Sequence, residues 1–201
     1  MIKKEKKSEA LLEKFLSAQR CKMANRLIES EHRQGRVLDV GCGSYPFFLL
    51  NTQFIEKYGL DRLIKDGNGD FQTTRGMTFY QSDLEKQEIF PFENDFIDVV
   101  TMLAVLEHIE PEKLISQLRE IHRILKPGGM FIITTPAPWA DIVLKILAAF
   151  KLINVALYKE HKDIYDSTKI LTVLEKSGFD RREMQTGYFE FFMNIWATAK
   201  K

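Results

Sequence analysis

The sequence predicts an α/β fold in which helices cover both faces of a mostly parallel sheet. Two observations predict it: short β-branched runs alternate with helix-length amphipathic stretches, and several of the short runs end at a glycine or an aspartate. Parallel strands need long crossover connections, which helices supply. The length of 201 residues fits one domain with one core, and 45% hydrophobic with 28% charged residues is typical of a globular protein.

The charge balance argues against a strong electrostatic attraction to nucleic acid or to an anionic membrane. The chain has 29 lysines and arginines against 28 acids, so it has no global field of either sign. Its two cysteines, Cys21 and Cys42, are too few for a disulfide framework. No apolar stretch follows the basic start as a signal peptide requires. We therefore expect a cytoplasmic protein with reduced thiols and no transmembrane span.

The first predicted element is an amphipathic helix over about residues 8–31, which Gly35 closes. Its apolar residues recur at helical spacing. They are Leu12, Leu16, Met23 and Leu27, widened by Leu11, Phe15, Ala24 and Ile28. We interpret the lysine-rich opening as a solvated terminus rather than a nucleic-acid arm, because it is short and includes Glu5 and Glu9.

Five strands and one helix are expected next. The strands run from Val37 to a Gly-Cys-Gly turn and over residues 54–60, 77–82, 96–102 and 130–135. The helix over residues 111–125 has leucines and isoleucine at helical spacing. It stops at Lys126-Pro127-Gly128-Gly129, because proline cannot continue a helix and glycine can adopt the left-handed cap.

The C-terminal third is predicted to contain two helical stretches and a closing strand pair. The most apolar stretch, residues 142–158, follows Trp139 and is either a lid over a ligand site or a buried core helix. Lysines interrupt it, so no run approaches the roughly 20 apolar residues that a bilayer requires. A helix over residues 168–177 ends at Gly178, and residues 182–189 and 191–199 are expected to pair as antiparallel strands.

The sharpest local signal is the glycine turn after the first strand, Val37-Leu38-Asp39-Val40-Gly41-Cys42-Gly43-Ser44. Open α/β sheets bind ligands at the carboxyl ends of their strands, and glycines let the backbone approach a ligand closely. A phosphate-binding P-loop is excluded because its lysine-containing run is absent. The dinucleotide fingerprint fails at its third glycine, where Pro46 stands.

Acidic residues follow three successive strands. Asp39 lies two residues before Gly41, where it would repel a pyrophosphate and attract a cation such as the ammonium or sulfonium of S-adenosylmethionine. Asp61 ends the second strand about 20 residues later, the spacing at which an acid meets ribose hydroxyls. Asp83 follows the third strand. The sequence therefore predicts a row of carboxylates at one edge of the sheet.

Taken together, five blocks resemble the class I S-adenosylmethionine-dependent methyltransferases, and most closely methyltransferase type 11, the branch that includes the quinone-biosynthesis methylases. The blocks are Asp39-Val40-Gly41-Cys42-Gly43, Asp61, Ser82-Asp83, Asp98-Val99-Val100 through Leu106-Glu107-His108-Ile109, and Leu125-Lys126-Pro127-Gly128-Gly129. The resemblance covers about residues 35–135. It implies a three-layer αβα Rossmann-like methyltransferase fold, with a seven-stranded, mostly parallel sheet whose last strand is antiparallel.

The resemblance also implies a division of the chain. One methyltransferase domain, residues 1–201, would consist of an N-terminal helix in 1–35, a cofactor-binding half in 36–135, and lid helices with C-terminal strands in 136–201. The cofactor would be S-adenosyl-L-methionine, with S-adenosyl-L-homocysteine as product.

Cofactor-binding residues carry over position by position. Asp39, Gly41 and Gly43 would hold the methionine moiety, with Cys42 as a small residue packed in the same loop. Asp61 would bind the ribose hydroxyls, and Asp83 with the backbone of Leu84 would bind the adenine. Met102 and Leu103 would close over the methionine part. This chain departs from the family at Tyr45-Pro46, where a third small residue is common, and in the shortness of the helix before Phe54.

Catalysis needs a base only if the acceptor arrives protonated. His108 is the first candidate and His161 the second, since one follows the fourth strand and the other follows the apolar stretch. The alternative is that Glu107-His108 orders the loop before Pro111. No metal site is predicted, because the calcium-loop-like Asp66-Gly67-Asn68-Gly69-Asp70 lacks the required glycine at Phe71 and glutamate at Met77.

The acceptor is expected to be a small molecule, aromatic or lipid-like, methylated on oxygen, nitrogen or carbon. Leu103-Ala104-Val105-Leu106 stands where nucleic-acid adenine methylases carry Asn/Asp-Pro-Pro-Tyr/Phe, and the Pro-Cys pair of cytosine-5 enzymes is absent. Three alternatives stay open: a cofactor-binding regulator or partner subunit without catalysis, a nucleic-acid methyltransferase, and a nucleotide-dependent oxidoreductase. The oligomeric state is left open.

Overall fold

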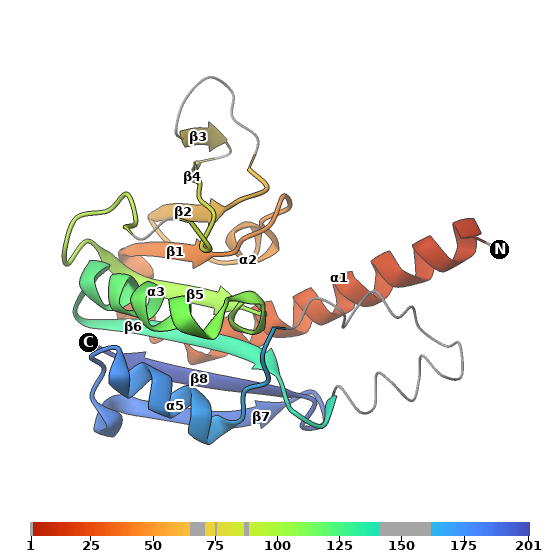
Figure 1. The fold of residues 1–201 in the computed structure, drawn as a ribbon. Helices are drawn as coiled ribbons and strands as arrows, with labels where there is room; N and C mark the ends of the chain where they lie inside the picture. The colour runs from red at the N-terminus through yellow and green to blue at the C-terminus, as the bar shows by residue number, and fades with distance from the viewer. Residues whose placement is uncertain (1, 65–70, 75, 87–88, 141–161) are drawn as a thin grey trace.

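One eight-stranded sheet forms the centre of the protein (Figure 1). The computed structural model describes residues 2–64, 71–74, 76–86, 89–140 and 162–201. Within these residues the strand order is β3-β4-β2-β1-β5-β6-β8-β7. The strands are β1 (Arg36–Val40), β2 (Glu56–Asp61), β3 (Phe71–Thr74), β4 (Met77–Gln81), β5 (Ile97–Leu103), β6 (Leu125–Pro136), β7 (Met184–Phe189) and β8 (Asn194–Lys200).

The sheet confirms the predicted α/β class and its seven-stranded frame. Strands β4, β2, β1, β5 and β6 pair in parallel, and β8 pairs antiparallel with β6 and with β7. An eighth strand, β3, joins the edge by pairing antiparallel with β4. The sequence predicted no strand over residues 71–74. Gly76, which directly precedes β4 and has a φ of +72°, provides the tight reversal that a hairpin needs.

Four helices and three 3₁₀ turns connect the described strands. The helices are α1 (Ile2–Leu27), α2 (Phe47–Leu50), α3 (Pro111–Ile124) and α5 (Ser167–Lys176), and the turns are η1 (Ser30–Gln34), η2 (Leu106–His108) and η4 (Arg181–Glu183). The helices predicted over 111–125 and 168–177 match α3 and α5 to within a residue. The N-terminal helix begins earlier than predicted and ends at Leu27, with η1 covering its expected last residues.

Two buried clusters, one on each face of the sheet, join the helices and the sheet into three layers. One cluster packs α3 and α5 against the sheet through Leu118 and Leu174, and the other packs α1 and α2 through Ala24 and Leu49. Figure 1 shows α3 and α5 on the near face of the sheet and α1 passing behind it. Alternating strand residues point to opposite faces, so β1 sends Leu38 to the first cluster and Val37 to the second.

Part of the predicted C-terminal region lies outside the described residues. The apolar stretch 142–158 and His161 fall there, as does the calcium-loop-like segment 66–70. In the part of the chain that the structure describes, no helix combines the length and the apolarity needed to cross a membrane.

Candidate active site

Two adjoining cavities open where the parallel strands end. The glycine-loop cavity, of about 650 Å³, is lined by Asp39, the loop from Gly41 to Tyr45, and part of α1. The strand-end cavity, of about 530 Å³, is lined by residues that follow β2, β4 and β5. Gly41 and Leu63 line both cavities, so the two adjoin along the carboxyl edge of the sheet, and together we call them the crevice.

The glycine loop is shaped by contacts that exclude side chains. The backbone N–H of Gly41 donates to the carbonyl oxygen of Leu60 at 2.7 Å, and its φ is +76°, in the left-handed region. A Cβ at this position would lie 2.3 Å from Cγ2 of Val105. Gly43, with φ +69°, donates its N–H to Oδ2 of Asp61 at 2.8 Å. The loop therefore needs glycine at both positions, and it is tied to the end of β2.

Asp39 is a buried carboxylate at the floor of the glycine-loop cavity. Its exposed fraction is 4%, and Thr101 Oγ1 donates a hydrogen bond to its Oδ1 at 2.7 Å. Burial raises the pKa of Asp39 to about 7, and the Thr101 hydrogen bond opposes that rise. Among the described residues, no basic side chain forms an ion pair with it. Asp39 is therefore a site at which a cation would be strongly favoured.

Asp61 and Asp83 lie in the strand-end cavity, as the predicted row requires. Asp61 accepts one hydrogen bond on each oxygen, from the N–H of Gly43 and from that of Leu63 at 2.7 Å. Asp83 accepts from the N–H of Glu85 at 3.1 Å and pairs with Lys86 at 3.2 Å. The Glu85 hydrogen bond is the main cause that lowers the pKa of Asp83. Both carboxylates are thus anchored at the edge, with Leu84 beside Asp83 lining the same cavity.

The strand β5 places its last two residues on opposite faces. Leu103 lines the glycine-loop cavity, on the same side as Thr101. Met102 is fully buried in the cluster that contains α3 and lines neither cavity. The side-chain alternation of a strand explains the difference, and the contact between Met102 and the cofactor stays a prediction.

Cys42 is a packed loop residue, in keeping with its predicted place. It is 7% exposed and belongs to the cluster of α1 and α2. Burial raises the pKa of its thiol, with Asp39 and Asp61 adding to the rise. A Cβ on Gly59 would lie 2.9 Å from the Cys42 sulfur, so position 42 accommodates only a small side chain. The raised pKa disfavours the thiolate.

His108 lines the strand-end cavity together with Asp61 and Asp83, not the glycine-loop cavity that holds Asp39. It closes the short η2 turn, where its N–H donates to the carbonyl oxygen of Val105 at 2.9 Å. The base function of His108 stays a prediction, and so does that of His161, which lies outside the described residues.

Sequence reasoning missed the contribution of α1 to the site. Lys14, Ser17 and Arg20 line the glycine-loop cavity. It also missed Ala104, which lines the strand-end cavity with φ +57°, a conformation that an alanine seldom adopts. The helical period showed which face of α1 is apolar, but no sequence signal showed that the helix passes this edge of the sheet.

Comparison with known proteins identifies a family. A family model described as a methyltransferase domain matches residues 12–183. The chain is 29% identical over 108 residues to the tRNA N(3)-cytidine methyltransferase METTL2 of Gallus gallus, across 49% of this chain and 29% of that protein. It is 32% identical over 106 residues to the sterol 24-C-methyltransferase erg6 of Schizosaccharomyces pombe, across 48% and 26%. The chain thus spans less than a third of the length of these curated relatives.

Solved structures share the fold at low sequence identity. The TM-score is 0.66 with a SAM dependent methyltransferase from Archaeoglobus fulgidus, at 19% identity over 92% of this chain and 94% of that one. It is 0.67 with a SAM-dependent methyltransferase, possible histamine N-methyltransferase, from Thermotoga maritima, at 16% identity over 98% and 95%. At such identities the similarity extends to the fold alone.

Proposed function

The chain belongs to the methyltransferase-domain family, the class I S-adenosylmethionine-dependent methyltransferases, and from this premise we propose that it methylates a small aromatic or lipid-like acceptor on oxygen, nitrogen or carbon. The observation that carries the assignment of the site is the crevice of two adjoining cavities, with Asp39 in its glycine-loop cavity and Asp61 and Asp83 in its strand-end cavity. Cofactor and acceptor are expected to meet at this carboxyl edge.

The lining residues fit the cofactor chemically. Asp39 has no cationic partner among the described residues, and an ammonium group would restore its ionised form. Each oxygen of Asp61 accepts one N–H, which leaves lone pairs for two hydroxyl groups. Leu84 and Ile109 provide an apolar surface next to Asp83, which suits a flat heteroaromatic ring. We therefore propose that the glycine-loop cavity takes the methionine part and the strand-end cavity the adenosine part.

The protein's contribution to methyl transfer is mainly binding and orientation. When bound, S-adenosylmethionine supplies a methyl group on a sulfonium, whose leaving group is already activated. Asp39 and the glycine loop would hold one end of the donor and Asp61 the other, and Leu103 would form part of the wall around the methionine part. Holding two reactants in reacting geometry contributes about 7–11 kcal/mol. His108 shares a cavity with Asp61, so we propose that it borders the nucleoside.

A lipid-like acceptor is supported by a relative and by composition. The Schizosaccharomyces pombe relative is a sterol methyltransferase. The apolar stretch 142–158 follows β6 in the sequence, and β6 itself ends on the same edge of the sheet as the crevice. A chain with 29 basic and 28 acidic residues also lacks the general positive charge that favours nucleic acid.

A nucleic-acid acceptor is the second candidate. Relatives from several vertebrates are tRNA N(3)-cytidine methyltransferases, and α1 exposes Lys14, Lys22 and Arg26. Radiolabelled methyl transfer from S-adenosylmethionine into a cell extract separates the two. We expect the label in the solvent-extractable small-molecule fraction; label in tRNA that ribonuclease releases would replace the first candidate with the second.

Calorimetry with S-adenosylhomocysteine tests the site. Asp61→Ala removes an acceptor of charged hydrogen bonds, so its affinity should fall by about tenfold or more. The matched control is Asp180→Ala, since Asp180 is an exposed aspartate that lines neither cavity. Binding that is equal in the wild type and Asp61→Ala would contradict the assignment of the site, and absence of binding by both would contradict the function.

A further inference from the structure

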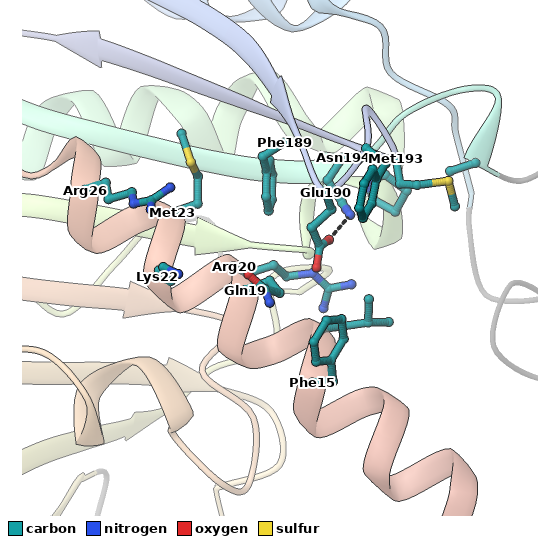
Figure 2. Close-up of a pocket in the computed structure, with 14 residues that line it drawn as sticks. Phe15, Gln19, Arg20, Lys22, Met23, Arg26, Phe189, Glu190, Met193 and Asn194 are labelled. Atoms are coloured by element: carbon teal, nitrogen blue, oxygen red, sulfur yellow. Dashed lines mark hydrogen bonds between the residues drawn. The ribbon is translucent and has the colours of Figure 1, made fainter.

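A third cavity, of about 380 Å³, lies between α1 and the β7–β8 hairpin (Figure 2). We call it the helix groove. Its lining is mostly apolar, with Leu16 and Met23 from α1, Pro136 from the end of β6, and Phe189 and Met193 from the hairpin. Pro136, Phe189 and Met193 lie at the same end of the sheet as the crevice, because β6 ends at Pro136 opposite the start of the antiparallel strand β8.

The groove and the cofactor crevice share one lining side chain. Arg20 lines both the helix groove and the glycine-loop cavity. Figure 2 shows Arg20 beside Glu190 of the hairpin, and the charge of Arg20 lowers the pKa of Glu190 against the larger raising effect of burial. The end of the groove nearest the crevice is thus marked by a pair of opposite charges.

The opposite end of the groove is basic. Lys22 and Arg26 are exposed, stand four residues apart on α1 and therefore share one face of the helix. Figure 2 shows both on the side of Met23, away from Phe15. Because Glu190 compensates Arg20, the positive charge of the lining is concentrated at Lys22 and Arg26.

The hairpin wall is held in a strained turn. Glu190, Phe191 and Phe192 have φ values of 51°, 53° and 66°, which residues with side chains rarely adopt in succession. Asn194 donates a short hydrogen bond to the Glu190 carboxylate. Such strain persists where the surrounding structure imposes it and is found at binding sites. Here the turn brings Glu190 and Phe191 into the lining of the groove.

We propose that the helix groove binds the methyl acceptor, and that this acceptor is an elongated amphiphile with an apolar body and an anionic group at its far end. The inference rests on the proposed function and specifies its substrate class. The apolar lining takes the body, Lys22 and Arg26 bind the anionic end, and the reacting end lies beside Arg20 at the junction with the glycine-loop cavity. Charge complementarity selects an anion over a neutral or cationic amphiphile.

Three probes of equal chain length test this: decanoate, decanol and decylammonium, each titrated by calorimetry into the protein saturated with S-adenosylhomocysteine. We expect the wild type to bind decanoate about tenfold more tightly than decanol, and decylammonium least. In the double variant Lys22→Glu/Arg26→Glu the order should invert, with decylammonium binding best. A misfolded variant would lose affinity for all three probes and for S-adenosylhomocysteine. An inverted order of probe affinities therefore shows a change of charge in the groove and not misfolding.

The matched control is Arg119→Glu/Lys176→Glu, which makes the same change of charge at exposed positions on α3 and α5 that line none of the three cavities. It should keep the order of the wild type. Met23→Ser should weaken all three probes and leave S-adenosylhomocysteine affinity unchanged.

Equal binding of the three probes, or an order unchanged by the charge reversal, would overturn the inference. Binding of tRNA through Lys22 and Arg26, without binding of any of the three probes, would overturn it as well. S-adenosylhomocysteine binding distinguishes failure of this inference from failure of the proposed function. If the protein binds S-adenosylhomocysteine but none of the probes, the groove proposal is wrong and the proposed function stands. If it binds the probes but not S-adenosylhomocysteine, the proposed function is wrong.

Discussion

Cofactor binding should be linked to the release of a proton from Asp39. Burial raises the pKa of this carboxyl to about 7 in the protein without cofactor, and the ammonium of a bound S-adenosylhomocysteine favours the ionised form. Below about pH 7, binding must therefore expel a proton. Affinity should rise by up to about tenfold per pH unit from about pH 5 to about pH 7 and then level off.

The same raised pKa makes the contribution of Asp39 to the stability of the cofactor-free protein fall with pH, whereas the affinity for the cofactor rises with pH. The folded-state pKa of Asp39 lies above its unfolded value of 3.8, so between about pH 4 and pH 7 the folded protein holds the proton and the unfolded chain has lost it. The contribution of Asp39 to stability is then greatest at low pH and is lost as the pH rises through about 7. A shift of about three units corresponds to a loss of about 4 kcal/mol, complete by about pH 7.

Calorimetry in two buffers of different ionisation heat counts the proton directly. At about pH 6 the wild type should release about 0.9 proton per S-adenosylhomocysteine bound, and Asp39→Asn, which has the same shape but no titration, should release none from this position. In urea unfolding, the stability of the wild type should fall relative to that of Asp39→Asn as the pH rises across the same range. Asp180→Asn is the control, because Asp180 has a pKa of about 2 and is exposed. An equal proton count in wild type and Asp39→Asn would refute the reasoning.

Three further changes have defined outcomes. Gly41→Ala should abolish S-adenosylhomocysteine binding in calorimetry because its Cβ would meet Val105, whereas Gly128→Ala, at a similar φ of +77° with nothing within 4 Å, should bind normally. Thr101→Val removes the hydrogen bond that lowers the pKa of Asp39, so the pH midpoint of binding should move up by about one unit. His108→Ala should raise the KM for S-adenosylmethionine more than it lowers kcat; a loss confined to kcat would favour a base.

The glycine loop and the acid row were predictable because they are local. Strand β1 is a short apolar run, Gly41 follows it directly, and Asp61 comes at the end of the next strand. Parallel pairing of β1 with β2 then brings Asp39 opposite Gly59 and the ends of both strands to one edge. No long-range contact had to be known for that inference.

Which side chains of β5 face the crevice depends on the alternation of side chains along a strand. This alternation can be derived from the sequence, but a family motif does not express it. Val99, Thr101 and Leu103 point to the face covered by α1, while Val100 and Met102 point to the opposite face. A family motif names positions in a row and takes no account of this period of two. Strand alternation alone would have separated Leu103 from Met102.

The role of α1 could not be predicted in this way. A helical period identifies the buried face of a helix, but it does not show which parts of the protein contact the residues on either side of that face. Ala24 and Ile28 pack on the sheet. On one side of that buried stripe Lys14 and Ser17 line the glycine-loop cavity, and on the other Leu16 and Met23 line the helix groove. Arg20 lines both cavities, so one helix contributes to the lining of the proposed cofactor site and of the proposed acceptor site. Because the two cavities share α1, a substitution that shifts this helix is expected to change the affinity for S-adenosylhomocysteine and for the groove probes together.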